Sequence, residues 1–315
     1  MTTVRDVLVD AERRLSAAGV PSASADAALI VSYVMERPKA ALYLHDEIPT
    51  EQRIRIERLI SQRSSRIPVQ HLLGWAPFRH LELSVGPGVF IPRPETELVA
   101  EAVIRSAGGG VVVDLCSGSG AVALAIATEA GAVDVHAVEL SSDAFPWLER
   151  NVAAYADRIA TANSRIATYL ADACSAAEPG APLARLAGTV DAVVSNPPYI
   201  PDAMVPRDPE VRDHEPHMAL FAGRDGLDVV RGIARTAAIL LKPGGLLVVE
   251  HADVQGADAG ERGVPGVLLA MVADETTADE VDLPRGTRMW VDVNDRPDLN
   301  GVPRFTMARK WSGTR

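Results

Sequence analysis

Between Gly110 and Glu250, short apolar runs alternate with segments of helical pattern, and this alternation restricts the fold more than any other feature of the chain. We predict strands at residues 111–115, 133–139, 166–171, 190–194 and 246–250. Helical patterns lie between or after them at 119–129, 141–155 and 225–241. Such alternation indicates an α/β fold with a parallel sheet and helices on both faces.

The rest of the chain predicts additional elements around this sheet. Residues 1–65 carry three helical patterns, and Thr3 is placed to cap the first of them. Residues 81–85 alternate at period two, and we expect a hairpin with 89–91 through the turn at 86–88. A helix then starts within 92–97 and runs to about 106. Near the end we expect a helix at 264–272, closing strands at 288–293 and 304–309, and a partly mobile stretch over 256–282.

Length and charge restrict the class of protein. A chain of 315 residues exceeds the usual single-domain size, so two domains are the default. Its 47% hydrophobic content supports a sizeable core, and with 4% aromatics that core is mostly Ala, Val, Leu and Ile. The net charge of −11 counts against a protein that tracks nucleic acid along a basic groove, and we expect no direct nucleic-acid contact.

The sequence also favours a cytoplasmic location. Its two cysteines, Cys116 and Cys174, do not suggest a disulfide framework and suit a reducing compartment. No apolar run reaches about 18 residues, so no membrane span is expected. The first ten residues lack the order of a signal peptide. The seven histidines show no regular metal-ligand spacing, and we expect no metal site.

The third N-terminal helical pattern, which begins at Pro49–Thr50, has an outer face rich in arginine. We place five side chains there: Arg53, Arg55, Arg58, Arg63 and Arg66. Two interpretations stay open, an ordinary solvated face and a docking surface for an acidic protein partner.

A glycine-containing loop follows the strand at 111–115. It consists of Asp114, Leu115, Cys116, Ser117, Gly118, Ser119 and Gly120. Glycines let the backbone approach a ligand, and ligands bind at the carboxyl ends of parallel strands. Glu139 ends the next strand, where a carboxylate can accept both ribose hydroxyls of a nucleoside. The loop lacks the full dinucleotide spacing and the phosphate-binding signature, so adenosine without phosphates fits best, and S-adenosylmethionine (SAM) is the common cofactor of that kind.

Asp172 follows the strand at 166–171. Its carboxylate can accept the exocyclic amine of adenine, or it can act as a helix cap or a solvated loop acid. The cysteines are interpreted as small bland residues rather than nucleophiles.

The segment Asn196-Pro197-Pro198-Tyr199 follows the strand at 190–194. Proline fixes φ and lacks a backbone donor, so this corner is stiff and rich in carbonyl acceptors. If the Asn196 side-chain oxygen and the Pro197 carbonyl accept the two N–H bonds of a planar nitrogen, they aim it at a sulfonium methyl group. Tyr199 would cover the acceptor. The pattern therefore predicts methyl transfer to an amide or aromatic amine nitrogen.

With these motifs, the sequence closely resembles the bacterial peptide chain release factor glutamine N5-methyltransferases, the PrmC (HemK) family. The matching segments span most of residues 1–251: Pro68–Gly74, Val89–Glu97, Asp114–Gly120, Asn196–Ile200, Pro209–Pro216, Ala219–Leu220, Gly223–Leu227 and Leu241–Gly245. Glu139 stands where aspartate is common, Ala173 where some members have an aromatic residue, and 78–80 lack a glycine that many members have.

The resemblance implies a class I SAM-dependent methyltransferase fold, Rossmann-like, with a seven-stranded, mostly parallel sheet and a small helical N-terminal domain. It implies a helical substrate-docking domain at 1–75, a hairpin linker at 76–92 and a catalytic domain at 93–315. Cofactor contacts are implied at Asp114, Cys116, Ser117, Gly118, Ser119, Gly120, Glu139, Asp172, Ala173 and Asn196. The substrate glutamine, in the Gly-Gly-Gln loop of class I release factors, is held by Asn196, Pro197, Pro198 and Tyr199, with catalysis assigned to Asn196, Pro197 and Tyr199.

Two other functions compete with this one. A nucleic acid amino-methyltransferase, acting on DNA adenine or ribosomal RNA guanine, shares the Asn-Pro-Pro-Tyr motif, but it needs a basic recognition region that this acidic chain does not show. A non-catalytic binding module on the same fold would be expected to lose Asn196 or the glycines, and both are present.

Overall fold

The structure is a computed structural model that describes residues 3–44, 47–106 and 108–313. The chain divides into two compact units. The first comprises residues 1–75, 85–87 and 205–215, and the second comprises 76–84, 88–204 and 216–315.

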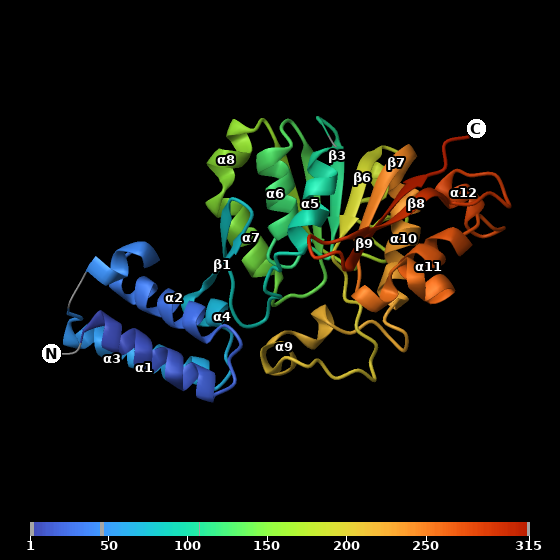
Figure 1. Cartoon of the computed structure of the whole chain (residues 1–315). Helices are drawn as coiled ribbons and strands as arrows, with labels where there is room; N and C mark the ends of the chain where they lie inside the picture. The colour runs from blue at the N-terminus through green and yellow to red at the C-terminus, as the bar shows by residue number, and fades with distance from the viewer. Residues whose placement is uncertain (1–2, 45–46, 107, 314–315) are drawn as a thin grey trace. The chain divides into compact units, whose positions relative to one another are not determined.

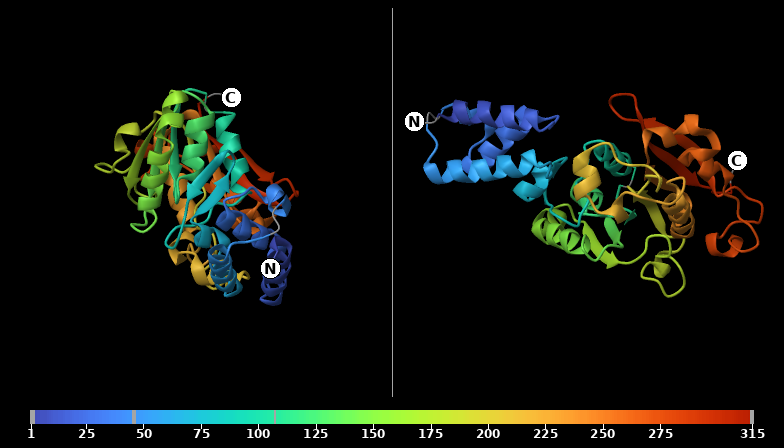
Figure 2. Two further views of the ribbon diagram at one scale, coloured as in Figure 1. Left: turned by 90° about the vertical axis from the view of Figure 1, so that its left-hand side faces the viewer. Right: turned by 90° about the horizontal axis from the view of Figure 1, so that it is seen from below.

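The first unit is helical. Its elements are α1 (Val4–Ala17), α2 (Ala23–Met35), the 3-10 helix η1 (Lys39–Leu44), α3 (Thr50–Ser64), α4 (Val69–Leu73) and α9 (Pro209–His214). Thr3 caps α1 as predicted: its hydroxyl accepts from Asp6 N at 3.1 Å, and the Asp6 carboxylate accepts from Thr3 N at 3.0 Å. Helices α1, α2 and α3 lie side by side and bury one apolar face each (Figure 2).

One expectation for this unit is wrong. Arg63 lies in the core of the unit, not on an exposed arginine face, because its guanidinium binds Asp26 of α2 at 2.8 Å and Glu210 of α9 at 2.7 Å. Arg66 also binds Glu210, with Nε 2.7 Å from the carboxylate. The exposed part of the predicted face therefore reduces to Arg53, Arg55 and Arg58.

The second unit is built on a seven-stranded sheet (Figure 1). The strands are β3 (Val111–Leu115), β4 (Asp134–Glu139), β5 (Arg165–Leu170), β6 (Val190–Ser195), β7 (Leu241–Glu250), β8 (Trp290–Pro297) and β9 (Pro303–Lys310). Their order is β5-β4-β3-β6-β7-β9-β8. The five strands from β5 to β7 are parallel, and β9 runs antiparallel to both β7 and β8.

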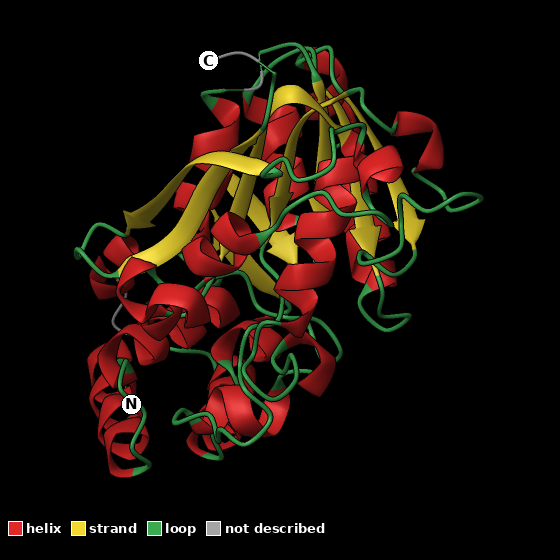
Figure 3. Ribbon diagram, turned by 90° about the vertical axis from the view of Figure 1, so that its right-hand side faces the viewer, coloured by secondary structure: helices red, strands yellow, loops and turns green. Residues whose placement is uncertain are grey.

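Helices cover both faces of this sheet, as the alternation predicted (Figure 3). One face packs against α5 (Thr96–Ile104), α6 (Ala121–Glu129), α7 (Phe145–Ala154) and α8 (Ala156–Thr161). The other packs against α10 (Asp228–Leu240), α11 (Val264–Ala270) and α12 (Ala278–Val281). Neighbouring strand residues enter opposite layers, as Val112 and Val113 do, so both faces of each central strand are apolar. Each such buried side chain contributes about 1.5–3 kcal/mol of burial free energy.

The remaining elements are short 3-10 helices: η2 (Ala184–Leu186), η3 (His217–Ala219), η4 (Asp253–Gln255) and η5 (Ala257–Arg262). The helix expected over 141–155 begins at Phe145, with Pro146 in its first turn. Within the described residues, no helix combines the length and the apolar character needed to cross a membrane.

The hairpin expected from 81–91 has a different partner strand. Strand β2 (Leu81–Ser84) pairs with β1 (Trp75–Phe78), and residues 89–91 form no strand. Pro77 lies within β1, where proline is tolerated because each strand of a two-stranded ribbon has an unpaired edge. The turn places Arg79 at a φ of 52°, and its side chain is held by Glu101 at 2.6 Å and Glu129 at 2.7 Å.

Candidate active site

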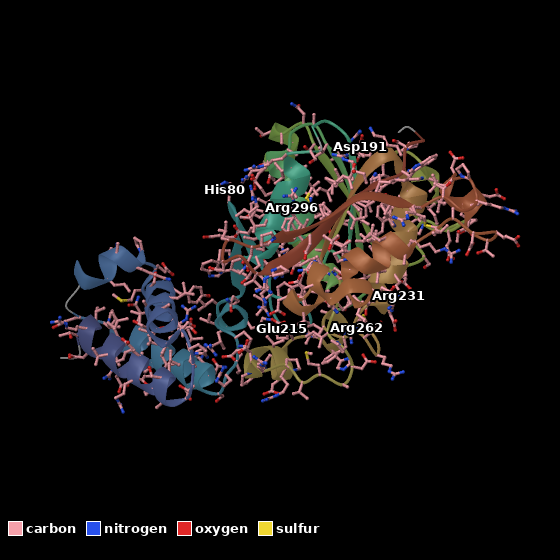
Figure 4. All side chains as sticks on the ribbon, turned by 45° about the vertical axis from the view of Figure 1, so that its right-hand side comes forward. His80, Asp191, Glu215, Arg231, Arg262 and Arg296 are labelled. Carbon is pink, nitrogen blue, oxygen red and sulfur yellow. The ribbon has the colours of Figure 1, made fainter. Side chains whose placement is uncertain are left out.

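The strand register brings the predicted motifs to one edge of the sheet. Leu115 of β3 lies opposite Val138 of β4 and Ser195 of β6, so the glycine loop, Glu139 and Asn196 all follow paired positions. Glu139 in turn lies opposite Leu170 of β5, two residues before Asp172. The opposite edge is marked by Asp191, near the start of β6 (Figure 4), whose carboxylate accepts from Val111 N at 2.7 Å. The candidate site is therefore at the carboxyl ends of parallel strands, where such sheets bind ligands.

The glycine loop contains three residues in the left-handed region. Cys116, Gly118 and Gly120 have φ values of 66°, 55° and 83°. A Cβ added at Gly120 would lie 2.7 Å from Leu148 Cδ1, so that glycine serves the packing of the loop on α7. A Cβ added at Gly118 would meet no atom within 4 Å, so the backbone there faces open space. Gly118 is the position where the loop can approach a ligand.

Asp114 braces this loop from inside the fold. Its side chain is buried, and its Oδ2 atom accepts from Ala123 N, in the first turn of α6, at 3.1 Å. The Ser117 hydroxyl donates to the Asp114 carbonyl at 3.0 Å. Burial raises the pKa of Asp114 to about 7, against the opposing hydrogen bonds from Ser117 and Ala123. These contacts support the shape of the loop, while direct cofactor contact by Asp114 stays a prediction.

Glu139 is fixed between two backbone donors. Its Oε2 atom accepts from Gly118 N and its Oε1 atom from Ser141 N, both at 2.7 Å. The side chain is buried, and burial raises its pKa. Each carboxylate oxygen keeps a second lone pair, so the pair of oxygens can still accept from two hydroxyl groups.

The predicted adenine-side residues differ in their surroundings. Asp172 is exposed, and its Oδ1 atom accepts from Cys174 N at 2.8 Å, which leaves the other oxygen for a ligand. Ala173 is buried in the apolar cluster beneath. Sequence reasoning missed two neighbours: Leu140 and Leu170 at the ends of β4 and β5 are 50% and 53% exposed. Large exposed apolar side chains beside the Glu139 carboxylate, which is predicted to bind a ribose, are suited to covering a flat base.

Asn151 is a second residue that the sequence did not single out. It is buried on α7, and its Nδ2 atom donates to the Ser119 carbonyl at 2.9 Å and to the Ser84 carbonyl at 3.0 Å. Its Oδ1 atom accepts from Ser84 N at 2.8 Å. Asn151 thereby ties β2 to the glycine loop. An asparagine in the interior of a helical pattern was the only signal available.

The Asn-Pro-Pro-Tyr segment is held on several sides. The Ser195 hydroxyl donates to the Leu115 carbonyl at 2.6 Å, and Asn196 Nδ2 donates to Thr96 Oγ1 at 3.1 Å. The Tyr199 carbonyl accepts from Gln255 Nε2 at 3.0 Å. Ile200 pairs with the chain at 220–222 through hydrogen bonds of 2.8 and 3.0 Å. Burial raises the pKa of the Tyr199 phenol, so that group stays neutral at physiological pH.

Among the residues that the structure describes, no group of three or more His, Cys, Asp or Glu side chains is arranged to hold a metal ion.

The strand order and the loop at its carboxyl edge define a class I SAM-dependent methyltransferase fold. Two family models match the chain: "PrmC N-terminal domain" over residues 6–74 and "Conserved hypothetical protein 95" over 76–211. A relative from Streptomyces coelicolor is 42% identical over 309 residues, which is 96% of each chain. One from Mycolicibacterium smegmatis is 38% identical over 315 residues, 98% of this chain and 99% of its own. Both are named release factor glutamine methyltransferase, and this chain belongs to that family.

Among solved structures, the chain is similar to a T. thermophilus 16S rRNA N2 G1207 methyltransferase in complex with AdoMet and guanosine. That match is 18% identical, has a TM-score of 0.45 and covers 75% of this chain and 49% of the other.

Proposed function

We propose that this chain transfers the methyl group of SAM to the side-chain amide nitrogen (N5) of the glutamine in the Gly-Gly-Gln motif of class I release factors. The observation that carries the proposal is the place of Asn196 and Pro197 beside the glycine loop, in a chain whose relatives match over almost the full length. We place the reaction in the cytoplasm, where translation terminates and where reducing conditions keep cysteines such as these two free.

The residues at the carboxyl edge fit SAM. Gly118 faces open space, Glu139 keeps lone pairs for two ribose hydroxyls, and Leu140 and Leu170 offer apolar surface for adenine. Asp172 keeps an oxygen for the exocyclic amine. When bound, SAM supplies an electrophilic methyl group on its sulfonium.

Asn196 and Pro197 prepare the acceptor nitrogen. An amide nitrogen is a poor nucleophile because its lone pair is delocalised into the carbonyl. The Asn196 Oδ1 atom and the Pro197 carbonyl accept the two amide N–H bonds, which orients the nitrogen and shifts electron density onto it. As the new N–C bond replaces the methyl–sulfur bond, the nitrogen becomes cationic and its proton becomes acidic enough to pass to water, so no strong base is needed at the start. Positioning of this kind supplies much of the rate.

The helical unit would dock the release factor. Arg53, Arg55 and Arg58 of α3 are exposed and present positive charge on an otherwise acidic chain. Such a face suits an acidic segment of a protein substrate and makes association sensitive to salt.

The test is a transfer assay with methyl-labelled SAM. The full chain is incubated separately with four substrates. These are purified class I release factor, the same factor with its Gly-Gly-Gln glutamine changed to alanine, ribosomal RNA and DNA. We expect label in the unchanged release factor and none in the alanine form. Label in nucleic acid and none in release factor would overturn the proposal in favour of an amino-methyltransferase acting on nucleic acid.

A further inference from the structure

Glu250 is a buried carboxylate beside the acceptor corner that the reaction described above does not use. It ends β7 and is 3% exposed. Ser195 lies opposite Val249 in the sheet, so Asn196 and Glu250 follow paired residues on neighbouring parallel strands. The Oε2 atom of Glu250 has no hydrogen-bond partner among the described residues. A buried carboxylate of this kind is costly for the fold, and its position beside Asn196 suggests a use.

Thr96 stands between the two side chains. It is the first residue of α5 and is 3% exposed. Its Oγ1 atom accepts from Asn196 Nδ2 at 3.1 Å, and Thr96 also acts on the Glu250 carboxyl, whose pKa it lowers against the larger effect of burial. A hydroxyl has one hydrogen to donate, and an ionised carboxylate can only accept. An ionised Glu250 would therefore take the Thr96 hydrogen, while the Thr96 oxygen accepts from the Asn196 amide group.

This chain of donors fixes which end of the Asn196 amide faces the substrate. With Nδ2 bound to Thr96, the Oδ1 atom is the end left for a ligand, and no described residue donates to it. We propose that Thr96 and Glu250 are positioning residues that set the polarity of the Asn196 amide, so that its oxygen and not its nitrogen meets the acceptor amide. This inference rests on the proposed function. If the Asn196 amide were reversed, its NH₂ group would face the NH₂ group of the substrate glutamine. Two donors cannot hydrogen bond to each other, so the substrate nitrogen would not be held.

Other charges surround Glu250 and act on its protonation. Arg93 and Glu95 precede α5, Arg304 lies on β9, and the Tyr199 phenol is near. Arg304 is also paired with Asp298 at 3.0 Å. Protonation of Glu250 turns an obligate acceptor into a donor, so the Thr96 hydrogen is no longer directed to it. The polarity of Asn196 is then lost.

The experiment compares Thr96→Val, Thr96→Ser and Glu250→Gln with the unchanged protein. Valine keeps the shape of threonine and removes the hydroxyl, serine keeps the hydroxyl, and glutamine can both accept and donate. The matched control is Thr306→Val on β9, because Thr306 is fully buried and its hydroxyl has no partner among the described residues. Steady-state kinetics with release factor are measured from pH 5.5 to 9, together with SAM binding by calorimetry.

We expect Thr96→Val to lower kcat by about 10²-fold while KM for release factor and the SAM dissociation constant change less than about threefold. Thr96→Ser should restore kcat to within about fivefold, and Thr306→Val should match the unchanged protein. Glu250→Gln should lower kcat by about tenfold and abolish the fall of kcat at acid pH.

The proposal is overturned if Thr96→Val, with SAM affinity intact, keeps kcat within about threefold, or if Glu250→Gln retains the acid limb. A Thr96→Val protein that loses SAM binding together with kcat would show a role in folding and would also overturn it. Failure of the unchanged protein to methylate release factor is a separate result, which rejects the proposed function itself.

Discussion

The carboxylate of Glu139 accepts a hydrogen bond of 2.7 Å from the backbone N–H of Gly118, which joins the end of β4 to the loop after β3. The other oxygen accepts from Ser141 N at the same distance. Because each carboxylate oxygen accepts from a backbone donor, the carboxylate is oriented before any ligand arrives. The carboxylate that we propose binds the ribose is thus also tied to the loop that would hold the rest of the cofactor.

This double role predicts a loss of SAM affinity in Glu139→Gln. The substitution replaces one carboxylate oxygen with an NH₂ group. That group cannot accept a hydrogen bond, so the contact with Gly118 N or the contact with Ser141 N is lost. We expect the dissociation constant for SAM to rise at least tenfold, which corresponds to about 1.4 kcal/mol, as measured by calorimetry. Glu149→Gln, an exposed position on α7, is the control and should bind SAM normally. Equal affinity in the two variants would remove Glu139 from the site.

A comparison of alanine substitutions at Gly118 and Gly131 separates the effect of filling the space above the loop from the effect of backbone strain. Both have left-handed φ values, 55° and 72°, and a Cβ at either would meet no protein atom within 4 Å. Alanine should therefore cost each variant a similar strain of about 1–2 kcal/mol. Only Gly118→Ala places a methyl group where SAM is proposed to bind, so we expect it alone to lose SAM binding. Thermal unfolding and calorimetry of both variants make the comparison, and parallel losses would contradict it.

Asn196→Ala separates the acceptor site from the cofactor site. The variant loses the Oδ1 acceptor, whereas Gly118 and Glu139 are held by contacts that do not involve Asn196. We expect transfer to release factor to fall at least 10³-fold with SAM affinity changed by less than about tenfold. A variant that turns over normally would show that the side-chain amide does not hold the acceptor nitrogen.

The central sheet and the main motifs followed from the sequence because their signals are local. A buried strand such as Val111–Leu115 is a continuous apolar run, and the residue after it must lie at the carboxyl edge. Glu139 and Asn196 could be brought together on that basis alone, and strand register confirms it.

The residues that the sequence did not reveal depend on contacts between distant segments. Thr96 belongs to a motif that predicted only a helix start, and Glu250 ends an ordinary strand. Arg63 was predicted on the outer face of its helix, since nothing local shows that Asp26 and Glu210 neutralise it in the interior. Burial of an arginine is decided by its partners, which periodicity cannot supply.

We expect the ionised carboxylate of Glu210 to stabilise α9 within the helical unit. Burial opposes ionisation of its carboxyl, but hydrogen bonds from Arg66 and Arg63 prevail and lower its pKa to about 2. Its stabilisation is therefore complete above about pH 4.5 and is lost as the pH falls toward 2. At pH 7, Glu210→Gln should leave Arg63 with one carboxylate and increase hydrogen exchange at residues 209–214 by at least about tenfold. Glu51→Gln, exposed on α3, should leave exchange there unchanged, and equal exchange in both variants would contradict the role of Glu210.

We expect the titration of Glu250 to make the free energy of unfolding of the second unit depend on pH. Burial raises its pKa from 4.5 to about 7, opposed by the Thr96 hydrogen bond and assisted by Glu95. Between these two values the folded state binds more protons than the unfolded state, so the free energy of unfolding falls as the pH rises through this window. Above about pH 7 the cost is complete and amounts to about 3 kcal/mol.

Glu250→Gln removes this titration. Asp114, whose pKa burial also raises to about 7, titrates in both proteins and cancels in the comparison. Urea unfolding at pH 5 and pH 8 should show the variant gaining about 2–3 kcal/mol relative to the unchanged protein as the pH rises. A difference that stays constant between the two pH values would mean that Glu250 titrates as an ordinary carboxyl.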